Sequence, residues 1–308
     1  MQLDVCNVSK SFSLSSGSRS KAVDGISFTA VSGEPFGLLG RNGAGKTTTM
    51  RMIMNIFAPD SGEVLVDGKP MNDKIKRGYL PEERGLYRKI SVIEQMIYFG
   101  RLKGLSGENA KSEALRLLNR LEMREYEKAL LETLSKGNQQ KIQLAVALMN
   151  EPDIIILDEP FSGLDPVNAA QLKELIREQS ERGAIVLFSS HQMSAVEDFC
   201  ESIVMIDKGR KVLDGKLSEI KRSYPKDKVR VVLDGELYDD VRFTKALEGL
   251  GSAEITKKGA LIRLRDGVAP SQLMCRVLYS GLPVLSQEIV EPTLEDIFVE
   301  KAGKEEAK

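Results

Sequence analysis

The chain has 308 residues, which is long enough for one large and one small domain. Its 44 basic and 45 acidic side chains give a formal net charge of −1 at pH 7, so no basic surface is available for nucleic acid and we expect no nucleic-acid partner. The three cysteines are scattered and suit reduced thiols, and no apolar run approaches the ~20 residues of a membrane-spanning helix.

A glycine-rich loop is the first informative element of the chain. Residues 40–47 read GRNGAGKT and match the phosphate-binding pattern GxxxxGK[ST]. The apolar run Pro35–Leu39 predicts a buried strand before the loop, and residues 48–57 predict a helix with an apolar face after it. Glycines let backbone N–H groups face phosphate oxygens, and the helix N-terminus adds partial positive charge.

In this pattern Lys46 reaches the β and γ phosphates and the Thr47 hydroxyl binds Mg²⁺. The sequence therefore predicts a nucleoside triphosphate site with Mg²⁺. The candidate phosphate-binding residues are Gly40, Arg41, Asn42, Gly43, Ala44, Gly45, Lys46, Thr47 and Thr48.

A helical lobe is predicted over about 83–135. Ser91 with Glu94 three residues later is a capping box, and it predicts a helix that buries one apolar side. The residues expected on that buried side are Ile93, Met96, Ile97 and Phe99. A second helix is predicted over Asn109–Leu121, with Leu115, Leu118 and Leu121 facing the lobe interior.

A second anion-binding position follows the helical lobe. Ser135 and Gly137 stand at the predicted start of a helix, where backbone N–H groups are free to bind an anion. The helical spacing continues through Ile142, Val146 and Met149. If this position and the phosphate loop lie on different lobes, one nucleotide cannot reach both in the same chain, whereas a second copy of the chain can complete the site.

A buried strand over Asp153–Leu157 ends in two acids. Asp158, at the carboxyl end of that strand, is placed to hold Mg²⁺ through water as the acidic partner of the phosphate loop. Glu159 is placed to polarise an attacking water. The alternative is a structural role as the N-cap of a helix in the turn. That role explains one of the two carboxylates and leaves the other without a function.

The C-terminal region predicts a separate α+β unit behind a polar linker at 221–228. Its pattern is βαββαβ, the ferredoxin-like arrangement, and no catalytic constellation is visible in it. The expected elements are a strand over Val229–Leu233, a helix over Asp240–Leu250, a hairpin of Ala253–Thr256 with Ala260–Leu264, a helix over Pro270–Tyr279 and a strand over Val284–Val290.

Taken together, these motifs resemble the nucleotide-binding subunit of an ATP-binding cassette (ABC) transporter over about the first 220 residues. Residues 40–47 resemble the Walker A loop, and 154–160 (IIILDEP) resemble the Walker B strand with its catalytic glutamate. Residues 134–140 (LSKGNQQ) resemble a variant of the LSGGQ signature, and 162–165 (SGLD) resemble the D-loop. The ending EPTLEDIFVE is similar to the tail of ABC-2 type exporter ATPases of the sodium-export kind.

The resemblance implies further site residues. Ser135 and Gly137 would contact ATP from the signature, and Asp165 from the D-loop. His191, the chain's one histidine, matches the switch histidine that contacts the γ phosphate, after a strand expected over 184–188. Phe12 matches the aromatic that stacks on adenine, although a core-strand phenylalanine is a fair alternative.

Two positions depart from the family pattern. Lys136 and Asn138 replace a glycine and a glutamine of the signature. Glu82, in the run GYLPEERGLY, stands where the family carries the Q-loop glutamine near Mg²⁺, so it adds a negative metal-directed group. The neighbouring Glu83 and Arg84 read equally well as a plain surface ion pair.

The sequence thus predicts an α/β fold: a P-loop ABC ATPase core over 1–222, plus the ferredoxin-like domain over 228–301. The core would combine a mixed sheet in a RecA-like lobe, an antiparallel β subdomain and the helical lobe. The resemblance implies an ATPase that forms a homodimer, or pairs with another ABC subunit, around two ATP. It would be cytoplasmic and peripheral on the inner face of the cell membrane, held there by a separate transmembrane permease.

In the family the helical lobe receives the permease, and Leu86, Tyr87 and Tyr98 are candidates for that contact, unless they only fill the lobe's own core. One alternative function is a soluble mechanochemical ABC ATPase, but such proteins usually carry two cassettes or long coiled-coil inserts. A nucleotide-sensing module without turnover is opposed by the intact acids and histidine. A small GTPase is disfavoured because no NKxD motif is present.

Overall fold

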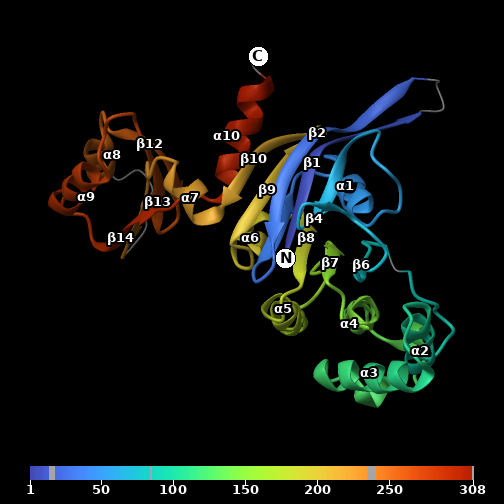
Figure 1. Ribbon diagram of the computed structural model, residues 1–308. Coiled ribbons are helices and arrows are strands. Elements are labelled where there is room, and N and C mark those ends of the chain that lie inside the picture. The colour runs from blue at the N-terminus through green and yellow to red at the C-terminus, as the bar shows by residue number, and fades with distance from the viewer. Residues whose placement is uncertain (14–17, 84, 235–240, 307–308) are drawn as a thin grey trace. The chain divides into compact units, whose positions relative to one another are not determined.

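The computed structural model describes residues 1–308 except 14–17, 84, 235–240 and 307–308; of 302–306 it describes the backbone alone. The chain divides into two compact units, Met1–Leu217 and Ser218–Lys308 (Figure 1). Each unit has its own sheets and its own apolar core, so each is described by itself. Within the described residues, no helix combines the length and apolar character needed to cross a membrane.

An antiparallel sheet of order β2-β1-β4-β5 opens the first unit. Its strands are β1 (Gln2–Ser13), β2 (Arg19–Val31), β4 (Ser61–Val66) and β5 (Lys69–Pro70). Alternating burial along β1 and β2 sends Leu3, Val5, Ile26 and Phe28 into a core shared with the larger sheet. This sheet corresponds to the predicted antiparallel β subdomain.

A six-stranded sheet of order β10-β9-β3-β8-β7-β6 forms the centre of the first unit (Figure 1). The strands are β3 (Pro35–Leu39), β6 (Arg77–Leu80), β7 (Ile154–Asp158), β8 (Ile185–Ser190), β9 (Ser202–Asp207) and β10 (Arg210–Lys216). All neighbouring pairs are parallel except β9 with β10. Since β3, β7 and β8 are buried along their whole length, they read as continuous apolar runs in the sequence.

Helix α1 (Lys46–Ile53) follows the glycine-rich loop directly. It begins before the expected residue 48, because the phosphate loop itself turns into the helix. It ends before the expected residue 57, because Asn55 takes a left-handed φ of 57° that stops helical hydrogen bonding. The expected strand at 153–157 lies one residue later, so Asp158 is the last residue of β7.

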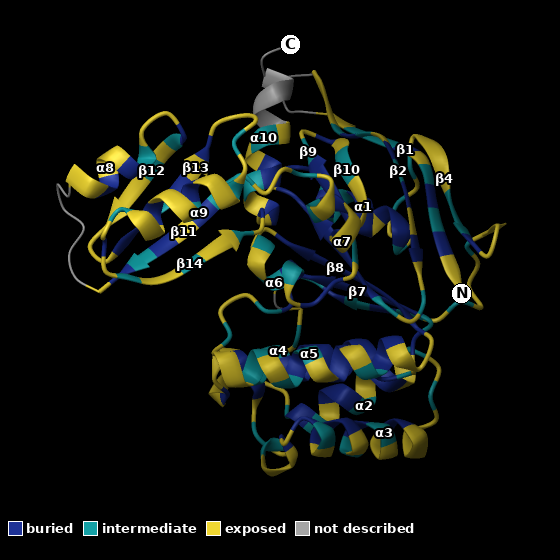
Figure 2. Ribbon diagram, turned by 90° about the vertical axis from the view of Figure 1, so that its left-hand side faces the viewer, coloured by how far each residue is buried: buried dark blue, intermediate teal, exposed yellow. Residues whose placement is uncertain are grey.

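The helical lobe consists of α2 (Val92–Leu102), α3 (Gly107–Arg120), η1 (Arg124–Tyr126), η2 (Leu131–Thr133) and α4 (Lys136–Leu148). Ser91 caps α2 as expected: its hydroxyl accepts from the Glu94 N–H and donates to the Glu94 carboxylate. The buried side of α2 is rotated from the expected one, since Val92, Gln95 and Met96 are buried whereas Ile93, Ile97 and Phe99 are half-buried. Figure 2 shows that α2 has both buried and exposed surface.

Other helices of the first unit are α5 (Pro166–Glu181) and α6 (Met193–Glu197). Helix α3 buries Leu118, followed by the buried Leu121, as the spacing predicts, while Leu115 is half-buried. Helix α7 (Leu217–Arg222) begins at the boundary between the two units, just ahead of the polar segment 221–228.

The second unit is a four-stranded antiparallel sheet of order β12-β13-β11-β14. Its elements are β11 (Lys228–Leu233), α8 (Val241–Leu247), β12 (Gly251–Thr256), β13 (Gly259–Leu264), α9 (Pro270–Tyr279), β14 (Val284–Val290) and α10 (Leu294–Glu306). Helices α8 and α9 pack one face of the sheet through Phe243, Ala246, Leu273 and Val277. This order confirms the ferredoxin-like βαββαβ prediction. The expected helix start at Asp240 lies outside the described residues.

A lysine inside the helical lobe holds two of its helices together. Lys103, the residue after α2, donates from Nζ to the carbonyls of Val146 and Ala147 in the last turn of α4, at 2.9 and 2.7 Å. The Val146 carbonyl also accepts from the Met149 N–H at 3.4 Å, and both carbonyls lie in the turn that carries the negative end of the helix dipole. Burial lowers the pKa of Lys103 to about 8.

This lowered pKa makes stability depend on pH in a defined direction. An unfolded lysine titrates near ~10.4, so between about pH 8 and 10 the unfolded chain binds more protons than the folded chain at this site. Relative to Lys103→Met, the parent should therefore gain folding stability as pH rises, by up to about 1.4 kcal/mol per pH unit. Urea denaturation from about pH 7 to 10 measures the difference, with the exposed Lys128→Met as control. A parent-minus-variant difference that does not rise with pH contradicts this assignment.

Candidate functional site

The phosphate loop closes one side of a pocket of about 340 Å³ at the carboxyl end of β3. The other walls come from Ala22, Glu82, Asp158 and Glu159. From the loop itself the pocket is lined by Arg41, Asn42, Gly43, Ala44, Gly45, Lys46, Thr47 and Thr48. The structure thus gathers the predicted phosphate-binding residues other than Gly40 with Asp158, Glu159 and Glu82.

Two glycines show why the loop needs its sequence. A Cβ at Gly40 would lie 2.2 Å from the carbonyl oxygen of Ile206, and Gly45 has a left-handed φ of 106° with a Cβ position 2.5 Å from the carbonyl oxygen of Ala22. Any side chain at either position would push the loop away from the neighbouring backbone. The backbone path around the pocket therefore depends on these glycines.

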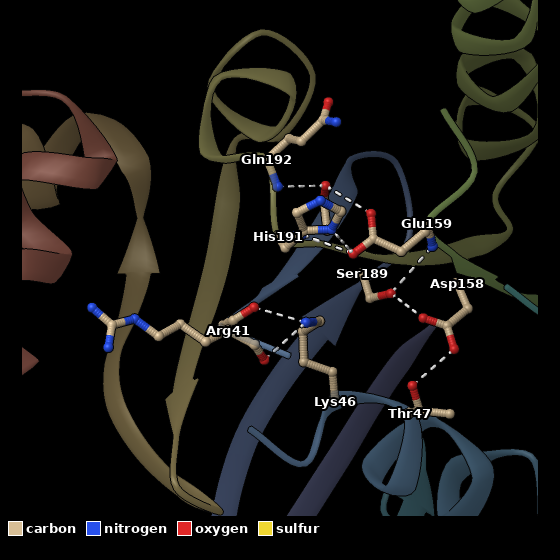
Figure 3. A network of polar contacts seen from close by, with 10 residues as sticks. Arg41, Lys46, Thr47, Asp158, Glu159, Ser189, His191 and Gln192 are labelled. Atoms are coloured by element: carbon tan, nitrogen blue, oxygen red, sulfur yellow. Dashed lines mark hydrogen bonds and ion pairs between the residues drawn. The ribbon is translucent and has the colours of Figure 1, made fainter. Parts of the chain in front are cut away.

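Lys46 is a buried cation at the base of the pocket. Its Nζ donates to the carbonyls of Gly40 at 2.7 Å and Arg41 at 3.3 Å (Figure 3). Burial lowers the pKa of Lys46, and the negative charges of Glu159, Asp158 and Glu82 partly oppose that shift. A buried ammonium with only two carbonyl partners has donor capacity left for phosphate oxygens.

Asp158 is fixed through both of its carboxylate oxygens. Thr47 Oγ1 donates to Oδ2 at 3.0 Å, and the Ser189 hydroxyl donates to Oδ1 (Figure 3). Since Thr47 opens α1 and Asp158 ends β7, this contact joins the phosphate loop to the Walker B strand. The two side chains present hard oxygen atoms side by side at the pocket wall.

Glu159 is buried and takes a left-handed φ of 51°, which is uncommon for a residue other than glycine. Its Oε1 accepts from the backbone N–H of His191 at 2.8 Å and lies 2.7 Å from His191 Nδ1, a hydrogen bond that needs the ring proton on Nδ1. Ser190 Oγ donates to Oε2 at 3.2 Å. Backbone strain of this kind concentrates at functional sites.

Glu82 lies in the segment after β6 and is exposed at the pocket. The segment is held from the helical lobe: Gln143 of α4, which is buried, donates from Nε2 to the carbonyls of Pro81 and Glu83 at 3.2 Å each. The suggested Glu83–Arg84 ion pair cannot be followed, because Arg84 lies outside the described residues.

Six predicted site residues do not line this pocket: Phe12, Gly40, Ser135, Gly137, Asp165 and His191. Of these, Gly40 and His191 are hydrogen-bonded to the pocket residues Lys46 and Glu159. Ser135 is the N-cap of α4 and accepts from the Asn138 N–H at 3.2 Å. Gly137 is buried, and a Cβ there would lie 3.1 Å from the side-chain amide of Asn168.

Asp165 caps α5 by accepting from the Val167 and Asn168 N–H groups, and its hydrogen bonds with Asn168 lower the Asp165 pKa. Phe12 is 42% exposed and makes an edge-to-face contact with Phe57 at 5.7 Å between ring centroids. It is therefore not a core-strand residue sealed from solvent.

Three polar residues of the site are not apparent from motif spacing. Ser189 and Ser190 end the apolar run of β8, and Gln143 sits on the buried side of α4. A pair of serines closing an otherwise apolar buried strand is the signal that could have indicated the first two. Gln143 has no such signal, because its partners are backbone carbonyls.

Comparison with known proteins places this site in a family. Residues 23–162 match the family model described as "ABC transporter", and residues 215–302 match "ATP-binding protein DrrA1-3-like, C-terminal domain". The chain is 44% identical to the uncharacterized ABC transporter ATP-binding protein YhaQ of Bacillus subtilis, over 92% of this chain and 94% of that protein. It is 30% identical to the linearmycin resistance ATP-binding protein LnrL of the same species, over 92% and 94%.

A solved structure agrees with the fold. The dimeric post-hydrolysis state of the ATP-binding cassette MJ0796, bound to ADP and Pi, superposes with a TM-score of 0.63 at 25% identity, covering 70% of this chain and 98% of that one. The pocket, the two sequence matches and this superposition agree with one another. The chain belongs to the ATP-binding subunits of ABC transporters, in the group that carries a DrrA1-3-like C-terminal domain, and is an ATPase.

Proposed function

We propose that this subunit binds Mg²⁺-ATP, dimerises around two ATP molecules and drives a separate transmembrane permease that exports its substrate. The observation that carries the proposal is the single pocket in which the phosphate loop, the buried Lys46 and the carboxylates of Asp158 and Glu159 meet. Export is supported by the similarity to LnrL, whose name describes drug resistance. The permease would determine which substrate is transported.

The pocket suits Mg²⁺. Thr47 Oγ1 and Asp158 Oδ2 lie 3.0 Å apart, and Mg²⁺ prefers such oxygen ligands together with phosphate oxygens and water. Thr47 would hold the ion directly and Asp158 through water, with the Glu82 carboxylate adding a further negative group. When bound, Mg²⁺ neutralises charge on the β and γ phosphates.

The chain's own residues then have separate tasks. Lys46 exchanges its carbonyl partners for phosphate oxygens. Glu159 accepts a proton from the water that attacks the γ phosphate, and His191, now bonded to Glu159 through its backbone and ring, contacts the γ phosphate in the closed state. Phe12 would stack on adenine from its exposed position at the end of β1.

A second copy is needed to complete the site. Ser135, Gly137 and Asp165 do not line the pocket of their own chain, but Ser135 caps a helix N-terminus that faces solvent and suits a phosphate. A head-to-tail dimer would bring these residues to the ATP of the partner. The dimer of the related cassette MJ0796 supports this arrangement.

This arrangement predicts nucleotide-dependent dimerisation. Glu159→Gln removes the proton acceptor while keeping the side chain's shape, so ATP with Mg²⁺ should trap a dimer that the parent forms only transiently. Size-exclusion chromatography with light scattering measures the mass. The matched control adds Ser135→Arg to Glu159→Gln, placing bulk at the proposed second-copy contact, and it should stay monomeric. A monomeric Glu159→Gln variant at saturating ATP counts against the sandwich.

The permease contact is proposed on the helical lobe. Tyr87 and Tyr98 are 49% and 47% exposed, yet they contact each other and Phe99 through ring centroids 5.4 to 6.1 Å apart. Leu86 is half-buried beside them. Such an ordered, half-exposed aromatic cluster suits contact with an apolar partner surface. Through it the subunit would sit at the inner face of the cell membrane, which co-purification of the native complex from membranes tests.

Glu82 predicts an unusual metal dependence. Glu82→Gln removes one negative metal-directed group, so it should shift the Mg²⁺ concentration that half-saturates ATP hydrolysis to higher values, while ATP affinity without metal stays nearly unchanged. Glu83→Gln, one residue away and not lining the pocket, is the control and should do neither. Superimposable Mg²⁺ titrations for the parent and Glu82→Gln would remove Glu82 from the metal site.

We expect the first unit to fold and bind ATP without the second unit. The second unit has its own core and no residue in the ATP pocket, so a chain ending at Ser223 should remain folded, bind ATP and keep basal ATPase activity, with changes confined to dimer stability or regulation. Circular dichroism and binding of a fluorescent ATP analogue check this. Loss of ATP binding by a truncated chain that is shown to be folded contradicts two independent domains at 1–222 and 228–301.

A further inference from the structure

Two consecutive serines at the end of β8 each face a different acid of the ATP site. Ser189 is fully buried and Ser190 is 5% exposed, so neither hydroxyl exchanges its partners freely with solvent. Figure 3 shows the Ser189 hydroxyl between Asp158 and the backbone nitrogen of Glu159, and His191 beside the Glu159 carboxylate. Buried hydroxyls whose bonds all go to one site constrain the geometry of that site.

The Ser189 hydroxyl bridges Asp158 and Glu159. It has one proton, which it donates to Asp158 Oδ1, and its oxygen accepts from the Glu159 backbone N–H at 3.3 Å. With Oδ1 held in this way, Oδ2 is left to face Thr47. Ser189 therefore fixes the rotation of the Asp158 carboxylate.

Of the two acids, the Ser190 hydroxyl bonds to Glu159. It donates to Glu159 Oε2 at 3.2 Å and accepts from the Gln192 N–H at 3.0 Å. Together with the His191 N–H on Oε1, it holds both oxygens of a carboxylate whose own backbone is in a left-handed conformation. In the described part of the chain no hydrogen bond joins Ser190 to Asp158, so each serine side chain donates to a different acid.

We propose that Ser189 and Ser190 are positioning residues with separate tasks: Ser189 sets the Asp158 carboxylate for the metal ion, and Ser190 sets the Glu159 carboxylate for the attacking water. The inference rests on the proposed function of this pocket. Residues that orient a metal-binding carboxylate typically contribute about 10- to 100-fold to metal affinity, because they stop the carboxylate from rotating.

The experiment measures metal binding apart from turnover. Mn²⁺ is titrated into the full-length protein saturated with a non-hydrolysable ATP analogue, and free Mn²⁺ is followed by electron paramagnetic resonance. Ser189→Ala should weaken Mn²⁺ binding on the order of tenfold, while binding of the analogue in the absence of metal is unchanged. Ser190→Ala should leave Mn²⁺ affinity as in the parent and lower kcat by roughly tenfold with little change in KM.

Conservative variants separate positioning from packing. Ser189→Thr keeps the hydroxyl and should restore Mn²⁺ affinity, whereas Ser189→Cys keeps the volume with a weak donor and should not. Equal losses of Mn²⁺ affinity in the two alanine variants, or rescue by Cys as well as by Thr, would overturn the division of tasks.

Asp158→Asn distinguishes this inference from the proposed function. If Asp158→Asn weakens Mn²⁺ binding and folded Ser189→Ala does not, the role of Ser189 is refuted and the metal site stands. If neither the parent nor any variant binds Mn²⁺ with the analogue, the proposed Mg²⁺-ATP site itself fails.

Discussion

The register of three neighbouring parallel strands determines the geometry of the ATP site. β8 lies between β3 and β7, and its Ser189 is paired with Leu38 on one side and with Asp158 on the other. The strands therefore end at the same level, where the phosphate loop leaves β3. A slip of one residue would exchange which side chains point to each face, so the buried apolar runs of all three strands fix this register. The ATP-site contacts follow from that alignment.

Opposite charges stabilise the buried lysine of the pocket. Lys46 places a buried positive charge among Asp158, Glu159 and Glu82. Each of these negative charges favours the protonated form of Lys46. A buried charge without such partners would cost several kcal/mol, about the desolvation penalty of one ion in a protein interior. Of these carboxylates, Asp158 accepts from Thr47, and Glu159 accepts from Ser190 at the end of β8 and from the His191 N–H that follows it, so both acids are held by other donors beside the lysine.

The helical lobe is joined to the pocket through backbone carbonyls. Gln143 holds the segment that carries Glu82, and Lys103 holds the far end of the same helix, α4, whose first residues follow Ser135. A shift of α4 would therefore move both the segment that carries Glu82 and the proposed contact of Ser135 with a second copy. This is a physical route by which nucleotide, dimer and permease could influence one another within one chain.

The strand-loop-helix of the phosphate site, the acids Asp158 and Glu159 at the end of β7 and the βαββαβ order of the second unit could be predicted from the sequence alone. These features are local: glycine freedom, apolar runs and turn residues act over a few neighbouring positions. Helix boundaries were less well determined, as at Asn55, because a single backbone torsion ended α1 early.

Which side chains meet became visible only in the folded chain. It brought Ser189 to Asp158, 31 residues away, and Gln143 to the carbonyls beside Glu82, and it separated Ser135, Gly137, Asp165 and Phe12 from the pocket. The bonds of Ser189 and Gln143 depend on strand register and on the packing of α4, which no spacing along the chain encodes.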